Sequence, residues 1–408
     1  MEYLKERDTV SITDTELSAY AYKKAKLPPS AQNGGFKLLY DTIRSDDISE
    51  LEPYCEFHTL ICGNSVTVNT SADRVYTSDG LLNVCVDTYV KNVYPTFNIT
   101  HNASVAARGV LCAKAAAESY SAEIVRVVLT MISRTTGESY SFCRDYNKSA
   151  LDKMAESLIA RASVFISVFK ERCTVRLQEI KKLSFPYKGI REGQHDLMLG
   201  VMRTLRRGGK LLAGAPTGTG KTMATLYPSV KALGEGYIDR IFYLTGKTVT
   251  GKAAFDSMKL LSESAPSLRC IMIHSKDHSC AEKGHDDTCF TCRRMCDCEI
   301  LGDTLSYSAR RDMALAELLS ENTMFDGKLI RECAEKYTLC PYELSLDVSE
   351  YCDCVVCDYN YVFDAKVRFR RYFTVDRGEK YAFLIDECHN LPDRVRNSYS
   401  TAGRKCWY

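Results

Sequence analysis

The chain has 408 residues, a formal net charge of +2 and 45% hydrophobic residues. This length and composition predict two or three globular domains with real cores. The near-neutral charge excludes a protein that holds nucleic acid through a global positive field, so any such binding needs local basic faces. No apolar run reaches the roughly 18 residues of a membrane-spanning helix, and the N-terminus lacks the apolar core of a signal peptide. We therefore expect a cytoplasmic protein without a membrane partner.

Residues 1–180 are expected to form one mixed α+β domain. Short runs of alternating character at 58–62 and 81–86 are typical of strands. The stretches 103–131 and 149–171 carry apolar residues at helical spacing and predict two helices.

Residues 181–408 alternate between strand and helix patterns, which is typical of a parallel sheet covered by helices. We therefore expect an α/β domain that begins near residue 181. A cysteine-rich helical insertion over 275–345 would interrupt it after the third strand. The expected strands are 210–215, 239–245, 268–274, 353–358 and 381–386.

A glycine-rich segment at the end of the first expected strand predicts a phosphate-binding loop. Its glycines would let backbone N–H groups approach phosphate oxygens, and the helix that follows would add the partial positive charge of its N-terminus. Lys221 can reach the β- and γ-phosphates, and the Thr222 hydroxyl can ligate Mg²⁺. The motif starts with Ala in the place of the usual Gly. The predicted ATP-binding residues of this loop are Ala215, Pro216, Thr217, Gly218, Thr219, Gly220, Lys221 and Thr222.

A second motif follows the apolar run 381–385, which is typical of a buried strand. Asp386 at the end of this strand can hold the Mg²⁺ together with Thr222, and Glu387 is placed to orient and deprotonate a water molecule. His389 would lie on the γ-phosphate side. We therefore predict ATP hydrolysis, with Lys221, Asp386, Glu387 and His389 as the catalytic residues.

Seven of the nineteen cysteines lie between residues 280 and 340. In a large chain without a signal peptide, this clustering indicates reduced thiols and a metal site rather than disulfides. Four thiolates suit an iron–sulfur cluster. A zinc knuckle is the alternative, and unligated thiols are the third interpretation. The candidate zinc ligands are Cys289 and Cys292 with Cys296, Cys298 or His285.

Residues 183–395 resemble the XPD/DinG family of superfamily 2 DNA helicases in these motifs and in several further segments. Phe185-Pro186-Tyr187 followed by Gln194 looks like the adenine-side motif, which implies that Gln194 reads adenine. Residues 243–248 look like the motif that touches the DNA backbone. Residues 357–364 resemble the Asn-Tyr segment before the family's Asp-Glu-Ala-His box. The implied DNA contacts are Thr245, Lys247 and Thr248.

The resemblance also implies a [4Fe–4S] cluster in the insertion. Cys340-Pro341-Tyr342-Glu343 resembles the last cluster ligand of the family, and Cys280 takes the first position. The two inner ligands stay open among Cys289, Cys292, Cys296 and Cys298, because the spacing departs from the family pattern. On their position before the expected helix 310–319, Cys292 and Cys298 are preferred.

The function that this resemblance implies is that of an ATP-dependent DNA helicase. A RecA-like first motor domain would couple ATP hydrolysis to 5′→3′ movement on single-stranded or forked DNA. The family places ATP between two motor domains, and this chain stops about twenty residues after Asp386. We therefore expect the second motor domain to be absent from a truncated chain, or to be encoded separately. A non-catalytic module that binds ATP and DNA is the second hypothesis.

In bacterial members of this type, the region before the motor resembles a PD-(D/E)xK nuclease. Asp73 stands where the first metal carboxylate would lie, and residues 87–91 stand at the Asp/Glu-x-Lys position. Lys91 fits this pattern, but Tyr89 occupies the place of the second carboxylate and cannot hold a cation of a two-metal site. Asp87 would restore the site only through a bulge or slip of the strand. We expect a degenerate nuclease fold that binds DNA, with an active helicase–nuclease as the third hypothesis.

Overall fold

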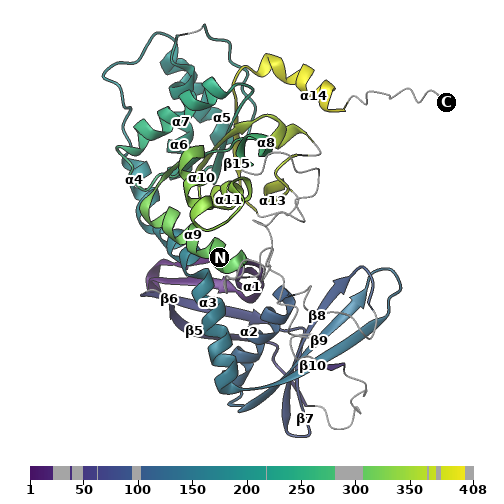
Figure 1. The fold of residues 1–408 in the computed structure, drawn as a ribbon. Coiled ribbons are helices and arrows are strands. Elements are labelled where there is room, and N and C mark those ends of the chain that lie inside the picture. The colour runs from purple at the N-terminus through teal and green to yellow at the C-terminus, as the bar shows by residue number, and fades with distance from the viewer. Residues whose placement is uncertain are drawn as a thin grey trace, which may run out of the picture. The chain divides into compact units, whose positions relative to one another are not determined.

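The computed structural model divides into two compact units (Figure 1). The first contains Met1–Lys170 and Phe290–Asp312, and the second contains Glu171–Cys289 and Met313–Tyr408. No helix in the part of the chain that the structure describes is long and apolar enough to cross a membrane. The described residues are 1–21, 37–38, 49–61, 63–93, 103–216, 218–280, 307–364, 367–373 and 378–399.

The first unit contains two sheets. In the first sheet, β2 and β6 are parallel, and the two outer pairs are antiparallel. Its strands in spatial order are β1 (Glu2–Leu4), β2 (Thr9–Thr13), β6 (Asn64–Ser71) and β5 (Tyr54–Ile61). The second sheet has the order β3 (Lys37–Leu38), β10 (Ser139–Asn147), β9 (Ile124–Ser133), β8 (Leu81–Val90), β7 (Arg74–Ser78) and β4 (Ser49–Leu51).

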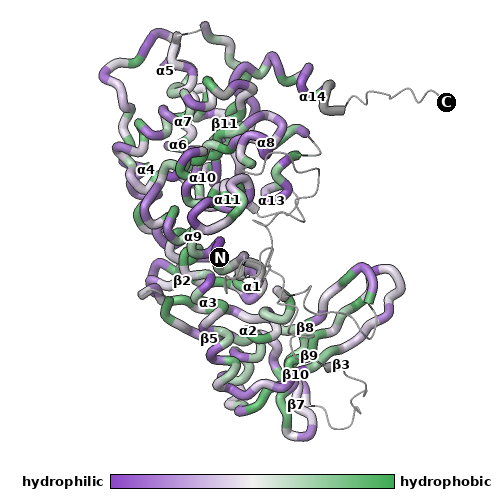
Figure 2. The backbone as a smooth tube through the Cα atoms, viewed as in Figure 1, coloured by the Kyte–Doolittle hydropathy of each residue, from purple (hydrophilic) through white to green (hydrophobic). Residues whose placement is uncertain are grey.

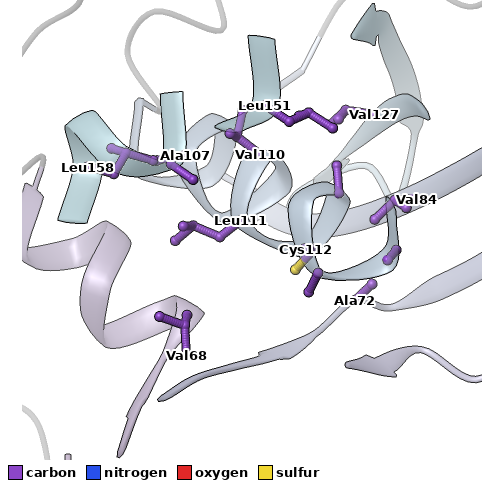
Figure 3. Packing of buried hydrophobic residues seen from close by; sticks show 14 of the residues in the cluster. Val68, Ala72, Val84, Ala107, Val110, Leu111, Cys112, Val127, Leu151 and Leu158 are labelled. Carbon is purple, nitrogen blue, oxygen red and sulfur yellow. The ribbon is translucent and has the colours of Figure 1, made fainter. Parts of the chain in front are cut away.

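Helices α1 (Asp14–Ala21), α2 (Ala103–Ser119) and α3 (Lys148–Glu171) belong to this unit, and a 3-10 turn, η1 (Lys5–Arg7), follows β1. Figure 3 shows side chains of α2 among hydrophobic side chains of β8, β9 and α3. A Cβ atom at Gly109 of α2 would lie 2.8 Å from Cγ1 of Val127. The glycine therefore lets α2 approach the sheet closely, which contributes to the tight packing of this core.

The predicted helix over 103–131 is correct only as far as residue 119. Residues 124–133 form β9, which pairs in parallel with β8 and antiparallel with β10. Six of its ten residues are β-branched valine, isoleucine or threonine, and such residues favour strands. The hydrophobic character of much of β8 and β9 is visible in Figure 2. The other expected helix, 149–171, is confirmed as α3.

The strands expected near 58–62 and 81–86 are confirmed by β5 and β8. Residue 62 lies outside the described part of the chain.

The second unit contains a five-stranded parallel sheet, which confirms the predicted α/β class for this half of the chain. Thr245 pairs with Asp358, and Leu244 pairs with Ile385, so the carboxyl ends of three strands meet at one edge. The loops that follow these strands are therefore neighbours. The spatial order is β13 (Met324–Phe325), β12 (Cys270–Met272), β14 (Cys354–Asp358), β11 (Arg240–Thr245) and β15 (Tyr381–Ile385).

Helices surround this sheet, and α9 begins in the first unit and ends in the second. In chain order the helices are η5 (Arg172–Arg176), α4 (Leu177–Lys182), α5 (Gln194–Arg207), α6 (Lys221–Gly234), α7 (Thr248–Ser262), α8 (Lys276–Ser279), α9 (Tyr307–Glu321), α10 (Gly327–Lys336), α11 (Pro341–Ser349), α12 (Asn360–Phe363), α13 (Arg370–Phe373), η9 (Cys388–Asn390) and α14 (Leu391–Tyr399).

The predicted strand over 210–215 is wrong, because these residues join no sheet ladder. Leu211 and Leu212 are 46% and 85% exposed instead of buried. The segment contains no β-branched residue, follows Gly209 and includes Gly214. Its local preference for a strand is therefore weak. The other four predicted strands are confirmed with shorter bounds.

The boundary between the units lies at residues 170 and 171, before the boundary that we expect near residue 181. Helix α4 accounts for this difference because it packs on α6 of the second unit. A Cβ atom at Gly234 of α6 would lie only 2.6 Å from Cγ2 of Ile180 in α4. Strand β13 lies inside the predicted insertion 275–345 and still pairs with β12 of the sheet.

A buried ion pair ties the segment before α4 to the sheet. Arg176 lies in η5, a single π-helical segment, and its Nη1 is 3.3 Å from Oδ2 of Asp353. Both side chains are at most 2% exposed. Burial lowers the pKa of Arg176 to about 10, and the charge of Asp353 opposes this shift. Asp353 also accepts a hydrogen bond from the backbone N–H of Arg269, at 2.9 Å.

We predict that Asp353→Ala lowers the free energy of unfolding by about 3–5 kcal/mol, because the substitution leaves the Arg176 charge buried without its partner. Denaturant unfolding followed by circular dichroism measures this change. Asp393→Ala is the control, since Asp393 pairs with Arg396 on α14 while their side chains are 76% and 74% exposed. Equal stability losses in the two variants would contradict the prediction.

Candidate nucleotide-binding site

The predicted phosphate loop turns through two glycines into helix α6. Gly218 and Gly220 have φ angles of 84° and 79°, a left-handed conformation that side chains rarely adopt. Helix α6 begins at Lys221, whose ammonium group donates a hydrogen bond to the carbonyl oxygen of Ala215, at 2.9 Å. The loop thus closes around its own lysine. Thr217 lies outside the described residues.

Asp386 lies within electrostatic reach of both predicted lysines. Its backbone N–H donates to the carbonyl oxygen of Leu244 at the end of β11, at 2.9 Å. Partial burial raises the pKa of the Asp386 carboxyl, and the neighbouring Glu387 raises it further. The positive charges of Lys221 and Lys247 act in the opposite direction. The structure therefore brings together residues that lie more than a hundred positions apart in the sequence.

Tyr243 lies close to both predicted Mg²⁺ ligands, a role that its motif does not reveal. Its ring is buried in β11, and its phenol is near enough to the Thr222 side chain and to Asp386 for both to affect its pKa. Burial raises the pKa of Tyr243, and the negative charge of Asp386 adds to the effect. A hydroxyl and a carboxylate oxygen are ligands that Mg²⁺ accepts, so Thr222 and Asp386 fit the ion. A buried tyrosine needs a polar partner for its hydroxyl, which is the signal in the sequence that could have indicated this contact.

Glu387 has an unusual backbone conformation for a residue with a side chain. Its φ and ψ angles of 50° and 44° lie in the left-handed region, which is uncommon outside glycine and is often found at functional sites. The Nδ1 atom of His389 lies 3.4 Å from Oε2 of Glu387, and the histidine is 71% exposed. His389 therefore contacts the predicted catalytic carboxylate, while its place beside the γ-phosphate stays a prediction.

Gln194, the predicted adenine-reading residue, begins helix α5 and is buried against the phosphate loop. Its Oε1 accepts a hydrogen bond from the backbone N–H of Arg191, at 3.0 Å, and its Nε2 donates to the carbonyl oxygen of Gly220, at 3.3 Å. The Arg191 side chain also donates to the carbonyl oxygen of Gly218. Gln194 and Arg191 thus brace the loop, and the reading of adenine by Gln194 stays a prediction.

A cavity of about 340 Å³ opens beside Gln194, between the start of α5 and the phosphate loop. Its volume lies in the range of small-molecule sites. Leu197 and Leu211 contribute apolar side chains to its wall, and Glu192 and Asp196 contribute acidic ones. This composition suits a base and its exocyclic amino group.

The loop predicted to touch DNA follows β11. Thr245 is only 6% exposed, and its hydroxyl accepts a hydrogen bond from the backbone N–H of Lys247, at 3.2 Å. The same hydroxyl contacts the hydroxyl of Thr250. Thr245 therefore shapes the turn, whereas Lys247 lies exposed at its tip. Thr248 begins α7, and its side chain is not among those described.

Cys280 and Cys340, the predicted outer cluster ligands, lie at the ends of two helices that contact each other. Cys280 follows α8, and Cys340 precedes α11. The contact between helices α8 and α11 is compatible with a metal site that Cys280 and Cys340 share. Among the residues that the structure describes, no three His, Cys, Asp or Glu side chains lie close enough together to hold a metal ion. Cys292 and Cys298, like the alternative ligands His285, Cys289 and Cys296, lie outside the described residues.

Asp73, the first predicted nuclease carboxylate, lies beside an arginine of helix α2. The Asp73 carboxylate accepts from the backbone N–H of Asp87, at 2.8 Å, and lies 3.5 Å from the guanidinium of Arg108. Arg108 also pairs with Asp14, at 3.2 Å. Strand β8 keeps a regular ladder through Val90, so Asp87 is not displaced by a bulge. Tyr89 on the same strand is 61% exposed.

Comparison with known proteins finds relatives for the second half of the chain. The DEAD_2 family model matches residues 251–404. The chain is 24% identical over 240 residues to the general transcription and DNA repair factor IIH helicase subunit XPD of Dictyostelium discoideum. It is 25% identical over 241 residues to the corresponding XPD/RAD3 subunit of Saccharomyces cerevisiae. A probable ATP-dependent helicase of Methanocaldococcus jannaschii is 24% identical over 222 residues.

These matches cover 53% of this chain and 30% or 31% of each of the three relatives. The chain thus spans about a third of the length of the curated relatives that it matches. Among solved structures, an XPD helicase matches 52% of the chain at 22% identity, with a TM-score of 0.37 and 34% of its own length covered. A truncated XPD matches 50% of the chain at 21% identity, with a TM-score of 0.35 and 54% of its own length covered. Over about half its length, the chain is therefore similar to XPD-type helicases, and residues 251–404 match the DEAD_2 family model.

Proposed function

We propose that the second unit is the ATP-binding motor domain of a DNA helicase that hydrolyses ATP while moving along single-stranded DNA. The observation that carries this proposal is the convergence of Lys221, Thr222 and Asp386 at one edge of a parallel sheet. In open α/β sheets, ligands bind outside the carboxyl ends of the strands. The similarity to XPD-type helicases over about half of the chain, with the DEAD_2 match over residues 251–404, supports the proposal.

In this proposal, the ATP phosphates occupy the loop from Ala215 to Thr222, and Lys221 exchanges the Ala215 carbonyl for phosphate oxygens. A charged phosphate is a stronger partner for an ammonium group than a neutral carbonyl. Thr222 and Asp386 hold Mg²⁺, and Glu387 orients and deprotonates the attacking water. Its contact with His389 links this carboxylate to an exposed surface.

The DNA strand is proposed to pass the loop after β11, where Lys247 would meet its phosphates. Movement in the 5′→3′ direction follows from the resemblance to XPD-type helicases. A second motor domain, in another chain or another part of a longer protein, would complete the cleft and supply arginines to the γ-phosphate. Such arginines contribute about 10³–10⁵ to the rate of hydrolysis.

An iron–sulfur cluster is proposed as the cofactor of the insertion, with zinc as the alternative. Cys280 follows α8 and Cys340 precedes α11, and these two helices contact each other. This contact supports a shared site for the two thiols. The inner thiols would come from Cys292 and Cys298. A bound cluster would cross-link the segment rigidly, and thiolates are its usual ligands.

The first unit is proposed to be a degenerate nuclease-like domain that contributes to DNA binding. Arg108 supports this proposal, because its guanidinium already pairs with Asp73, the first carboxylate that a metal ion would need, and with Asp14 beside it. The function of a non-catalytic ATP- and DNA-binding module is the second candidate. The missing ladder at 210–215 favours it, since the phosphate loop lacks the strand that would anchor its first residues.

Replacement of the loop lysine tests the proposed function. We predict that Lys221→Ala abolishes DNA-stimulated ATP hydrolysis and weakens ATP binding at least about tenfold, equal to about 1.4 kcal/mol. Phosphate release and isothermal titration measure the two effects. Lys259→Ala on the exposed side of α7 is the matched control. Turnover that survives in Lys221→Ala would refute the motor assignment, while binding without turnover in the wild type would favour the binding module.

Magnesium binding by Asp386 makes a prediction about pH. Because the pKa of Asp386 is raised, protons compete with Mg²⁺ for this carboxylate as the pH falls from neutral into the acid range. We expect the affinity for Mg²⁺–ATP to fall over that range in the wild type, and Asp386→Asn to have a weaker affinity with a flatter pH profile. Titrations with and without Mg²⁺ measure both.

The same shift has a consequence for stability without Mg²⁺. A raised pKa means that the folded state favours the protonated carboxyl over the charged carboxylate. The stability that the protonated carboxyl contributes at low pH is therefore lost as the pH rises through the pKa. Asp386→Asn should therefore melt at an equal or higher temperature than the wild type at neutral pH. A clear drop in its melting temperature would show that Asp386 has a structural rather than a metal-binding role.

The first unit generates a prediction of its own. We expect no Mn²⁺-dependent cleavage of single-stranded DNA by the wild type, because the Arg108 guanidinium lies among the carboxylates and Tyr89 offers no second metal ligand. A gel assay with labelled DNA tests this expectation. Cleavage by the wild type that disappears in Asp73→Ala would establish the helicase–nuclease instead.

A further inference from the structure

The hydroxyl of Tyr359 lies between the nucleotide site and the loop proposed to bind DNA. Tyr359 follows β14 directly, and its side chain is 1% exposed. The hydroxyl donates to the carbonyl oxygen of Asp386 and lies 3.4 Å from the carbonyl oxygen of Glu387. The ring of Tyr359 packs against Gly246 of the loop after β11, where a Cβ atom would lie 2.9 Å from its Cε2. One buried side chain thus contacts the backbones of both loops.

Arg394 reinforces this bridge from helix α14. Its guanidinium lies over the Tyr359 ring, 5.8 Å from the ring centre, where a cation–π attraction operates. Its Nη2 donates to the carbonyl oxygen of Gly246, at 3.1 Å, and its Nη1 lies 3.4 Å from Oδ2 of Asp358. Arg394 therefore fixes the loop after β11 and the end of β14 against each other.

Gly246 permits this arrangement through the absence of a side chain. A Cβ atom there would lie 2.9 Å from Cε2 of Tyr359 and 3.1 Å from Nη2 of Arg394. Neither neighbour can retreat easily, because the ring is buried and the guanidinium is held at two points. The glycine brings the loop backbone into direct contact with both side chains, so a displacement of one loop presses on the other.

The turn at the nucleotide end of the bridge has a strained backbone. Glu387 occupies a left-handed conformation, which a residue with a side chain keeps only when its surroundings hold it there. The carbonyl oxygens of Asp386 and Glu387 face the Tyr359 hydroxyl, and the backbone N–H of Asn390 donates to the Glu387 carbonyl, at 3.0 Å. Mg²⁺–nucleotide binding at Asp386 would pull on the same turn. The hydroxyl would transmit that pull to Gly246 and Lys247.

We propose that Tyr359 and Arg394 are positioning residues that couple nucleotide binding at the Asp386–Glu387 turn to DNA binding at the Gly246–Lys247 loop. This inference rests on the proposed function, because it takes both ligands from there. Neither residue needs to touch a ligand. Their role is to make the geometry of one loop depend on the geometry of the other.

Two substitutions separate this role from general stability. Tyr359→Phe removes only the hydroxyl and keeps the buried ring. Arg394→Gln removes the cation from a half-exposed side chain and keeps one donor. Arg396→Gln is the matched control, because Arg396 lies on the same helix, is 74% exposed and pairs with Asp393 three positions away. Melting temperatures verify that each variant of the full chain folds.

The experiment measures a thermodynamic cycle. The affinity for Mg²⁺–ATPγS is determined with and without saturating oligo(dT), and the ratio of the two affinities is the coupling factor. Linkage requires the same factor when the affinity for oligo(dT) is measured with and without the nucleotide. Coupled sites usually show factors of about 5–150. We expect a factor of this size in the wild type and in Arg396→Gln.

In Tyr359→Phe and Arg394→Gln, we expect the coupling factor to fall below about twofold, while the affinity for each ligand alone changes by less than about threefold. A factor that stays at the wild-type value in either variant overturns the proposal, and so does a wild type that binds both ligands without coupling. Variants that lose affinity for single ligands in proportion to a lowered melting temperature would assign a purely structural role and also overturn it. Failure of the wild type to bind ATPγS would refute the proposed function instead.

Discussion

The parallel pairing of β14, β11 and β15 is the constraint on which the rest of the second unit depends. Parallel strands that are in register end at the same edge, so the residues after Thr245, Asp358 and Ile385 become neighbours. The loops supply a lysine, a tyrosine and two acidic residues to one small region. No local preference could bring these side chains together, because more than a hundred residues separate the first loop from the second.

Close backbone approach adds a second constraint. Gly220 lies where a Cβ atom would meet the Gln194 amide at 2.6 Å, and Gly246 lies where a Cβ atom would meet the Tyr359 ring. In both places a polar side chain contacts the backbone of a neighbouring loop. The phosphate loop is braced from α5, and the loop after β11 is braced from β14 and α14. The site is therefore held by side chains that do not themselves need to contact a ligand.

The sequence is sufficient for the parts of the site that depend on local pattern. The phosphate loop ends in α6, and Asp386 follows a strand, as their motifs predict. Prediction fails where tertiary context decides. Residues 124–133 read as helix until the ladders with β8 and β10 are known, and 210–215 read as strand although no ladder forms. The partners of Tyr243 and Tyr359 could not be identified from local pattern either, because they lie in helix α6 and in the turn after β15, more than twenty positions away in the sequence.

The site around Asp386 and the carboxylates around Arg108 differ in how a bound cation would change their charge balance. Lys221 bonds to the neutral Ala215 carbonyl, and Asp386 is partly buried beside Glu387, so an arriving Mg²⁺–phosphate group improves the electrostatics of both. Arg108 already bonds to two carboxylates, and a cation that displaced it would leave a guanidinium without compensation. The first arrangement would gain from a bound ligand, whereas in the second Arg108 already pairs with Asp73 and Asp14, although Oδ1 of Asp87 is buried without a hydrogen-bond partner. This difference in charge compensation, rather than the number of carboxylates, supports the proposal that the chemistry of this chain lies in its second unit.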